Sequence, residues 1–395
     1  MKSLAFYAGL GWVIAASLAC RWLCLDFRSG DFVGFLSPWY DFIQTHGGWR
    51  ALRYDFSDYS ILYLYGLTFA TYLPLPKLVA IKVLSIAGDY VAAGLIYRLV
   101  LARWREPWIA LFAAALALGL PTVVMNGALW GQCDVLYSAA LLGVVAGALA
   151  ERPLGVVAAF GLACALKPQG VFLAPFVAGL LITGRVPWKW APVAPAVYLL
   201  TGVPALLLGR PVMLALFNNT RQRSIPGLTL GATNFYQWVP GGWSDLMEPV
   251  GWALAAAAGG YLVLGMWWWE RRPAAVRGAP AAFLVHSALL SALIMPYCLP
   301  AMHERYFFSA DLLSLVYAFY HPKRWGVAVL IQFASAFTYL PYLFHLEPVP
   351  RPLLALVLTL ALVWVVRDYL VVLGLLTVPG GRRIAAAAPT NQNLP

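Results

Sequence analysis

Residues 78–100 read LVAIKVLSIAGDYVAAGLIYRLV, a predominantly apolar run long enough to cross a bilayer as a helix. About 20 such residues span the hydrocarbon core. Similar runs recur along the whole 395-residue chain, which is 62% hydrophobic and only 11% charged. A soluble domain needs a more polar surface, so the surplus apolar surface must face lipid. The sequence therefore predicts an all-α, polytopic integral membrane protein.

About twelve apolar runs are candidates for transmembrane helices. They fall near residues 4–25, 78–100, 108–125, 135–150, 153–167, 170–184, 190–208, 251–269, 279–296, 307–320, 325–343 and 353–373. The first resembles a signal peptide, but no clean small-residue cleavage site follows it, so we expect a retained first helix. We predict a single membrane-embedded domain over residues 1–384 and a disordered cytoplasmic tail over 385–395. The five cysteines show no metal-ligand spacing.

The stretch Ile61–Leu73 decides the topology. It ends at Pro74 and Pro76 and is too short to span comfortably, so we expect an interfacial helix within a first outer loop over 26–77. If it does not span, the basic clusters all fall on one side of the membrane, which the positive-inside rule makes cytoplasmic. Both termini are then cytoplasmic. The Ala-, Gly- and Arg-rich composition favours a prokaryotic plasma (inner) membrane.

Polar, acidic and aromatic residues gather on the opposite face. Five segments are predicted there, namely 26–77, 125–134, 167–170, 209–250 and 297–306. The inner loops are short and basic, so we expect the working side to face the periplasm or exterior. The net charge of +11 could indicate nucleic acid. In a membrane protein the placement of Lys and Arg matters more than their sum, and the expected partners are membrane lipids and no nucleic acid.

Two acids in the first outer loop are candidates for proton transfer. Asp31 follows Gly30 directly after the first helix, where a partly desolvated carboxylate can accept the proton of an attacking hydroxyl. Asp58 precedes Tyr59 and is the second candidate. Either acid has an ordinary alternative role, as a solvated loop residue or as the N-cap of an interfacial helix.

Two turns between apolar runs carry further polar groups. In the turn 125–134, Trp130 offers a stacking surface, and Gln132 and Asp134 offer hydrogen bonds, as a sugar requires. An interfacial Trp followed by a helix-capping Asp has the same pattern. In the second turn, Lys167 lies near the membrane surface beside Gln169, where it can meet an anionic head group or simply snorkel.

A third cluster, Met302-His303-Glu304-Arg305-Tyr306, begins a late helix. Arg305 is suited to bidentate binding of phosphate, and His303 can bind the same oxygens. The alternative to phosphate binding is a local ion pair between Glu304 and Arg305. Arg221 in the second large outer loop, 209–250, is a further candidate cation. No P-loop, GxGxxG or Asp-x-Asp pair is present. The sequence therefore does not support a metal-dependent enzyme that uses a sugar nucleotide.

In this order, the motifs resemble those of the GT-C glycosyltransferases, which use a polyprenyl-phosphate or dolichyl-phosphate sugar. Asp31 matches that family's essential Asp after helix one. Its Asp-Tyr-Pro-Pro-Leu motif is similar to Asp58-Tyr59-Ser60-Ile61-Leu62, without the prolines, and its Gly-x-Phe/Gln-x-Asn/Asp turn to Gly131-Gln132-Cys133-Asp134. Lys167-Pro168-Gln169 looks like its Lys-Gln turn with an inserted proline, and His303-Glu304-Arg305 like its His-Glu-Lys motif. The likeness covers nearly the whole chain.

The resemblance implies transfer of one hexose, mannose or glucose, from a polyprenyl-phosphate sugar to a lipid-linked or cell-envelope glycan. Asp31 is then the general base of an inverting displacement that needs no metal or cofactor. Donor-phosphate contacts are expected from His303, Arg305, Lys167 and Arg221. Sugar or acceptor contacts are expected from Asp58, Tyr59, Trp130, Gln132, Asp134, Gln169 and Glu304.

Two other functions remain open. A lipid-linked oligosaccharide flippase or transporter predicts polar groups near the bilayer midplane, and Lys82, Asp89 and Asp311 are the candidates. The crowding of polar residues on one face favours surface chemistry over transport. A sugar-binding or assembly subunit without activity is the third possibility. The oligomeric state does not follow from the sequence.

Overall fold

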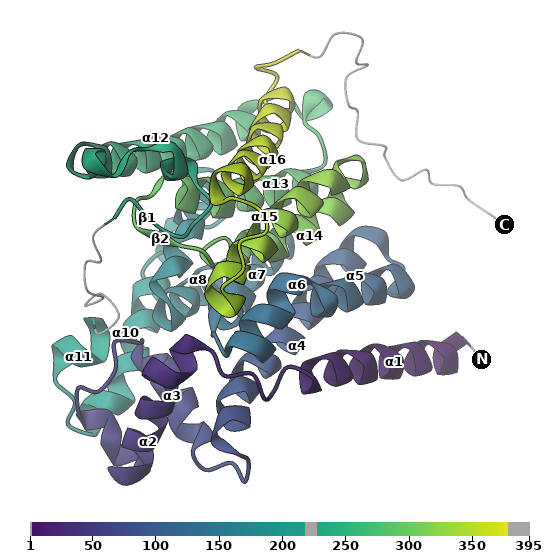
Figure 1. Ribbon diagram of the computed structural model, residues 1–395. Coiled ribbons are helices and arrows are strands. Elements are labelled where there is room, and N and C mark those ends of the chain that lie inside the picture. Colours follow the sequence, from purple (N-terminus) through teal and green to yellow (C-terminus); the bar gives the residue numbers. More distant parts are fainter. Residues whose placement is uncertain (1, 218–226, 378–395) are drawn as a thin grey trace.

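The computed structural model describes residues 2–217 and 227–377 and is almost entirely helical (Figure 1). The α-helices are α1 (Lys2–Trp22), α2 (Ser37–Thr45), α3 (Ile61–Ala70), α4 (Lys77–Trp104), α5 (Pro107–Gly119), α6 (Pro121–Val123), α7 (Asp134–Leu149), α8 (Pro153–Leu166), α9 (Ala174–Ile182), α10 (Val193–Leu207), α11 (Val212–Phe217), α12 (Ser244–Arg271), α13 (Pro280–Cys298), α14 (Phe308–Tyr320), α15 (Trp325–Phe344) and α16 (Arg351–Val372). Short π and 3-10 helices are η1 (Phe32–Leu36), η2 (Gly48–Arg53), η3 (Val124–Trp130), η4 (Pro168–Leu173), η5 (Trp188–Trp190), η7 (Phe235–Trp238), η8 (Gly241–Trp243), η9 (Ala274–Val276) and η10 (Pro322–Arg324).

Among the described residues, seven helices are long and apolar enough to cross a membrane, or eight if one bent pair forms a single span. The seven are Leu4–Trp22, Lys77–Trp104, Trp188–Leu207, Gly241–Arg271, Pro280–Cys298, Pro322–Phe344 and Arg351–Val372. Shorter apolar helices lie between them. The protein is therefore an all-α membrane-embedded protein, as expected, while the number of about twelve crossings stays a prediction. The tail 385–395 lies outside the described residues.

The bent pair replaces the straight crossing expected at 108–125. Helix α5 ends at Gly119, and the chain then turns by 48° into Pro121–Trp130, which comprises α6 and the π-helix η3. Proline at position 121 has no N–H for an intrahelical bond and clashes with the preceding turn, which favours a kink or break at this position. The break directs the segment that ends at Trp130 away from the axis of α5.

The first outer loop forms a small helical unit with its own apolar cluster, which includes Leu36, Ile43, Leu52 and Leu64. The stretch from Ile61, which was expected not to span, forms helix α3 with 10 residues. The Ser60 side chain caps its N-terminus by accepting a hydrogen bond from the Tyr63 N–H. This length is too short to cross a bilayer, so the prediction of a short helix is confirmed. Helix α3 packs against α4 and α10 (Figure 1).

Two short strands join segments that are far apart in sequence. Strand β1 (Thr229–Leu230), from the second outer loop, pairs in parallel with β2 (Met302–His303). The next residue, Gly231, has φ of +96°, a conformation that favours glycine. This pairing fixes the loop beside the 302–306 segment, a contact that no sequence pattern predicted.

Helix α1 lies at the edge of the molecule (Figure 1), and only 11% of its apolar window is buried. Its last turn is attached firmly, because the buried Arg21 forms an ion pair with Asp89 of α4 at 2.8 Å. The carbonyls of Cys24, Leu25 and Phe27 lie directly after α1 in the chain. They accept hydrogen bonds of 2.7–2.9 Å from the Lys82 ammonium of α4. Two of the polar residues expected near mid-membrane, Lys82 and Asp89, therefore hold helices together.

Candidate functional site

Asp31 begins η1 and accepts hydrogen bonds from three neutral side chains. Trp130 Nε1 donates to Oδ2 at 2.9 Å, Gln132 Nε2 donates to the same oxygen, and Tyr342 Oη donates to Oδ1 at 2.6 Å. We call these four residues the Asp31 cluster. A carboxylate has about four acceptor positions, so Oδ1 keeps one for a further donor. Asp31 is partly exposed, and the carboxylate can reach a ligand hydroxyl.

Short contacts on either side of Asp31 fix its position. Ser29 Oγ donates to the Trp130 carbonyl at 2.7 Å and accepts from the Phe32 N–H at 3.1 Å. A Cβ on Gly30 would lie 3.0 Å from Tyr342 Oη, so a larger residue would crowd the hydroxyl that bonds Asp31.

Trp130 occupies the centre of the site and is fully buried. Its ring stacks on Tyr342, with centroids 4.6 Å apart and planes at 20°. The guanidinium carbon of Arg305 lies 5.3 Å from the Trp130 ring centroid, within the range of a cation–π interaction. Trp130 therefore touches Asp31 through its N–H and Arg305 through its ring, so the acid and the cation expected to act together contact the same side chain.

Asp134 begins helix α7 and lies in a different environment. It is fully buried and forms an ion pair with Lys167, which ends α8. Asn126 Nδ2 donates to its Oδ2 at 2.8 Å, and Arg305 Nε lies 3.6 Å from the same oxygen. These four residues form the Asp134 cluster. Two cations therefore flank one carboxylate, although Arg305 is shared with Glu304.

The 303–306 segment supplies His303, Glu304 and Arg305 to the site. Arg305 Nη1 donates to Glu304 at 2.9 Å, so the local ion pair considered from the sequence is present. Burial would raise the pKa of Glu304, but the hydrogen bond from His303 and the charge of Arg305 outweigh it, and the pKa is lowered. His303 Nδ1 is 3.7 Å from Glu304, and the His303 side chain is 26% exposed.

Tyr59 links the two clusters. Its hydroxyl donates to Gln132 Oε1 at 3.0 Å, and the Lys167 ammonium lies 5.7 Å from its ring centroid. Burial raises the pKa of Tyr59 well above its usual value, so this phenol stays neutral. The neighbouring Asp58 is exposed, whereas Gln169 is buried in η4. Arg221 lies outside the described residues.

Two residues of the site were missed by sequence reasoning. Tyr342 lies 311 positions from Asp31 in the chain, at the end of a helix whose apolar pattern resembles that of its neighbours. Asn126 was visible in the turn 125–134 but was given no role, and it holds Asp134 from the π-helix η3. The irregular helix after Pro121 was the available signal, because broken helices in membranes often line sites.

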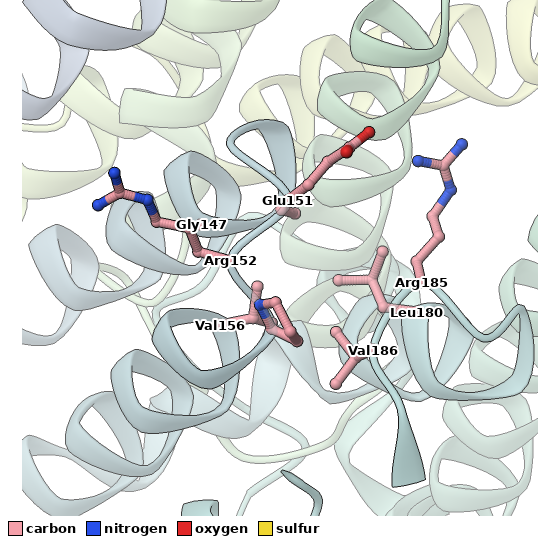
Figure 2. A pocket seen from close by; sticks show the side chains of 9 residues that line it. Gly147, Glu151, Arg152, Val156, Leu180, Arg185 and Val186 are labelled. Atoms are coloured by element: carbon pink, nitrogen blue, oxygen red, sulfur yellow. The ribbon is translucent and has the colours of Figure 1, made fainter.

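A cavity of about 250 Å³ lies at the other end of α7, lined by Gly147, Ala148, Glu151, Arg152, Pro153, Val156, Leu180, Arg185 and Val186 (Figure 2). Its floor is apolar. The Arg152 and Arg185 side chains point away from each other in Figure 2, and Arg185 forms an ion pair with Glu270. The two arginines therefore do not converge on one ligand, and we place the candidate site at the Asp31 end.

The sequence matches no protein-family model and no curated protein. Within residues 2–217 and 227–377, no three His, Cys, Asp or Glu side chains come together as a group able to hold a metal ion.

Proposed function

We propose that the protein is a membrane glycosyltransferase of the GT-C type. It transfers one hexose, mannose or glucose, from a polyprenyl-phosphate sugar to a lipid-linked or cell-envelope glycan. The observation that carries this proposal is the contact of Trp130 with both Asp31 and Arg305, through its N–H at 2.9 Å and its ring at 5.3 Å. A group able to accept a proton and a group able to hold a leaving phosphate are thereby adjacent.

In the proposed reaction, the acceptor hydroxyl attacks the anomeric carbon from the face opposite the phosphate. Asp31 takes the hydroxyl proton on Oδ1, the new glycosidic bond forms, and the bond to the phosphate oxygen breaks with its electron pair. Arg305 and His303 bind the phosphate and stabilise its growing charge. Inversion at the anomeric carbon follows from the single displacement, and no metal or cofactor takes part.

The Asp134 cluster supports this assignment indirectly. Lys167 is occupied by Asp134, so it contributes to the positive field more than to direct phosphate contact. Arg305 Nε is 3.6 Å from Asp134, too long for a hydrogen bond, and has no hydrogen-bond partner among the described residues. Arg305 therefore keeps donor capacity for a phosphate oxygen. Glu304, Tyr59 and Gln132 complete the polar surface that would face the sugar and the acceptor.

We place this site on the non-cytoplasmic face of a plasma (inner) membrane, with both termini in the cytoplasm. In this topology, the seven long helices, the bent pair and the short helices 134–149, 153–166, 168–182 and 308–320 make the twelve crossings, while α3 stays at the interface. The flippase alternative needs free polar groups at the midplane. Two of its three candidates, Lys82 and Asp89, are bound within the helical core, and only Asp311 lacks a hydrogen-bond partner among the described residues; the binding of the other two favours chemistry at the surface.

The test is turnover by the purified protein in lipid nanodiscs, supplied with a panel of polyprenyl-phosphate sugars and assayed for released polyprenyl phosphate. We expect release with at least one donor, and an Asp31→Asn variant should lose about 10²–10⁴-fold in rate while it still binds donor. Asp41→Asn is the matched control, because Asp41 lies in the same loop in an exposed pair with Lys77, and it should keep normal activity.

Two results would contradict the proposal. Near-normal turnover by Asp31→Asn would remove Asp31 as the base. Binding of donors without release from any of them would favour the sugar-binding subunit, and donor movement between leaflets without release would favour the flippase.

A further inference from the structure

Asp311 in α14 is a buried carboxylate outside the two clusters. Its exposure is 0%, and neither Oδ1 nor Oδ2 has a hydrogen-bond partner among the described residues. By contrast, the buried Asp89 is paired with Arg21 at 2.8 Å. An ionised carboxylate without a positive partner is strongly disfavoured in an apolar interior. Asp311 must therefore either keep a proton or bind a cation.

Neutral oxygen atoms surround this carboxylate. The hydroxyls of Ser335 in α15 and Thr122 in α6 are next to it, and no Lys, Arg or His of the described chain acts on it. Thr122 also donates to Gln332 Oε1 at 3.0 Å, and the Ser335 hydroxyl has no hydrogen-bond partner among the described residues. Carboxylate, hydroxyl and amide oxygens are the ligands that hard cations prefer.

Other buried hydroxyls of the described residues also lack hydrogen-bond partners. The hydroxyls of Tyr137, Ser309 and Tyr339 are buried and have no hydrogen-bond partner that meets normal geometry within the described chain. Tyr339 is close enough to interact electrostatically with Asp311 as well as with Asp134.

We propose that Asp311, Ser335 and Thr122 bind a sodium ion in the helical core. A single carboxylate balances one positive charge, and the other ligands are neutral, so a monovalent ion fits better than Ca²⁺ or Mg²⁺, which usually take more carboxylates or several waters. The ion would join α6, α14 and α15, the helices that position Tyr342 and the 303–306 segment. This site is independent of the proposed transfer reaction.

The experiment measures thermal unfolding of the purified protein in NaCl, KCl and choline chloride at equal ionic strength. We expect a saturable rise in Tm of about 2–5 °C that is specific to sodium. An Asp311→Asn variant should lose this rise. Asp368→Asn is the control, because Asp368 has its own partner in Arg324, and it should keep the rise.

A second measurement covers the case in which Asp311→Asn does not fold. Ser335→Ala should raise the sodium concentration that gives half of the Tm increase, and ²²Na binding should reach one ion per chain in the wild type. Equal Tm in all three salts, or an unchanged sodium effect in Asp311→Asn, would overturn the proposal and leave a bound proton as the neutralising group. Neither outcome depends on glycosyl transfer.

Discussion

The Asp31 cluster and the Asp134 cluster each contain one aspartate, but the two carboxylates have opposite surroundings. Asp31 is partly exposed and bonded only by neutral donors. Asp134 is fully buried between the cations Lys167 and Arg305. The difference indicates a division of roles, since a base must reach its substrate while a buried, charge-compensated acid orients the cations around it. Three measurements can break or sharpen this comparison.

The largest effect is expected from Asp134→Ala. Removing this carboxylate leaves Lys167 buried without its partner, so we expect the free energy of unfolding to fall by about 3–5 kcal/mol. This free energy is measured by unfolding the protein in mixed micelles with increasing SDS. Asp31→Asn should lower the free energy of unfolding by only about 1 kcal/mol in the same assay, because it alters hydrogen bonds but leaves no buried cation without its partner. Equal losses in both variants would refute the division of roles.

An intermediate effect is expected from Tyr342→Phe. The variant keeps the ring that stacks on Trp130 but loses the hydroxyl that donates to Asp31 at 2.6 Å. If Tyr342 positions the base, kcat should fall about tenfold with KM for the donor unchanged. Tyr339→Phe is the matched control, because the Tyr339 hydroxyl has no hydrogen-bond partner within the described residues. Similar kcat values for the two variants would exclude a positioning role.

The smallest effect is expected from acidification, through the carboxylate of Glu304. Because the pKa of Glu304 is lowered by its interactions with His303 and Arg305, its ionised form stabilises the fold. This contribution is complete above the usual value of 4.5 and is lost as pH falls through the lowered pKa. We expect Tm to fall on acidification below about pH 4.5, and Glu304→Gln should remove part of that fall.

Glu347→Gln provides the comparison for the pH experiment. Glu347 is exposed in a pair with Arg351, and exposed pairs contribute little, so this variant should follow the wild-type curve. If Glu304→Gln also followed it, the 303–306 segment would not depend on the charge of Glu304.

The topology drawn from the positions of Arg and Lys stays a prediction, whereas the all-α, membrane-embedded class could be predicted from composition and apolar length, because these are local properties of the sequence. The short helix at Ile61 is an example. The break at Pro121 was harder to predict from the sequence, since a proline alone does not give the direction of the 48° bend. That bend decides where Asn126 and Trp130 lie.

The candidate residues were predicted segment by segment, whereas their contacts depend on packing between distant helices. Asp31, Trp130 and Arg305 were each chosen for their chemistry, and the structure brings them together. Tyr342 could not be found in this way, because an aromatic residue near a helix end is common at membrane interfaces. The absence of a charged partner at Asp311 is likewise a property of the packed core.

The three carbonyls held by Lys82 have a consequence for how the protein tolerates different membranes. Only 11% of the apolar window of α1 is buried against the rest of the protein, so in a bilayer its tilt should follow changes in thickness. The Lys82 ammonium fastens the chain between α1 and Asp31 to α4, which is half buried in the bundle. Tilting of α1 is thus uncoupled from the position of the Asp31 carboxylate, and thinner or thicker bilayers should leave its geometry unchanged.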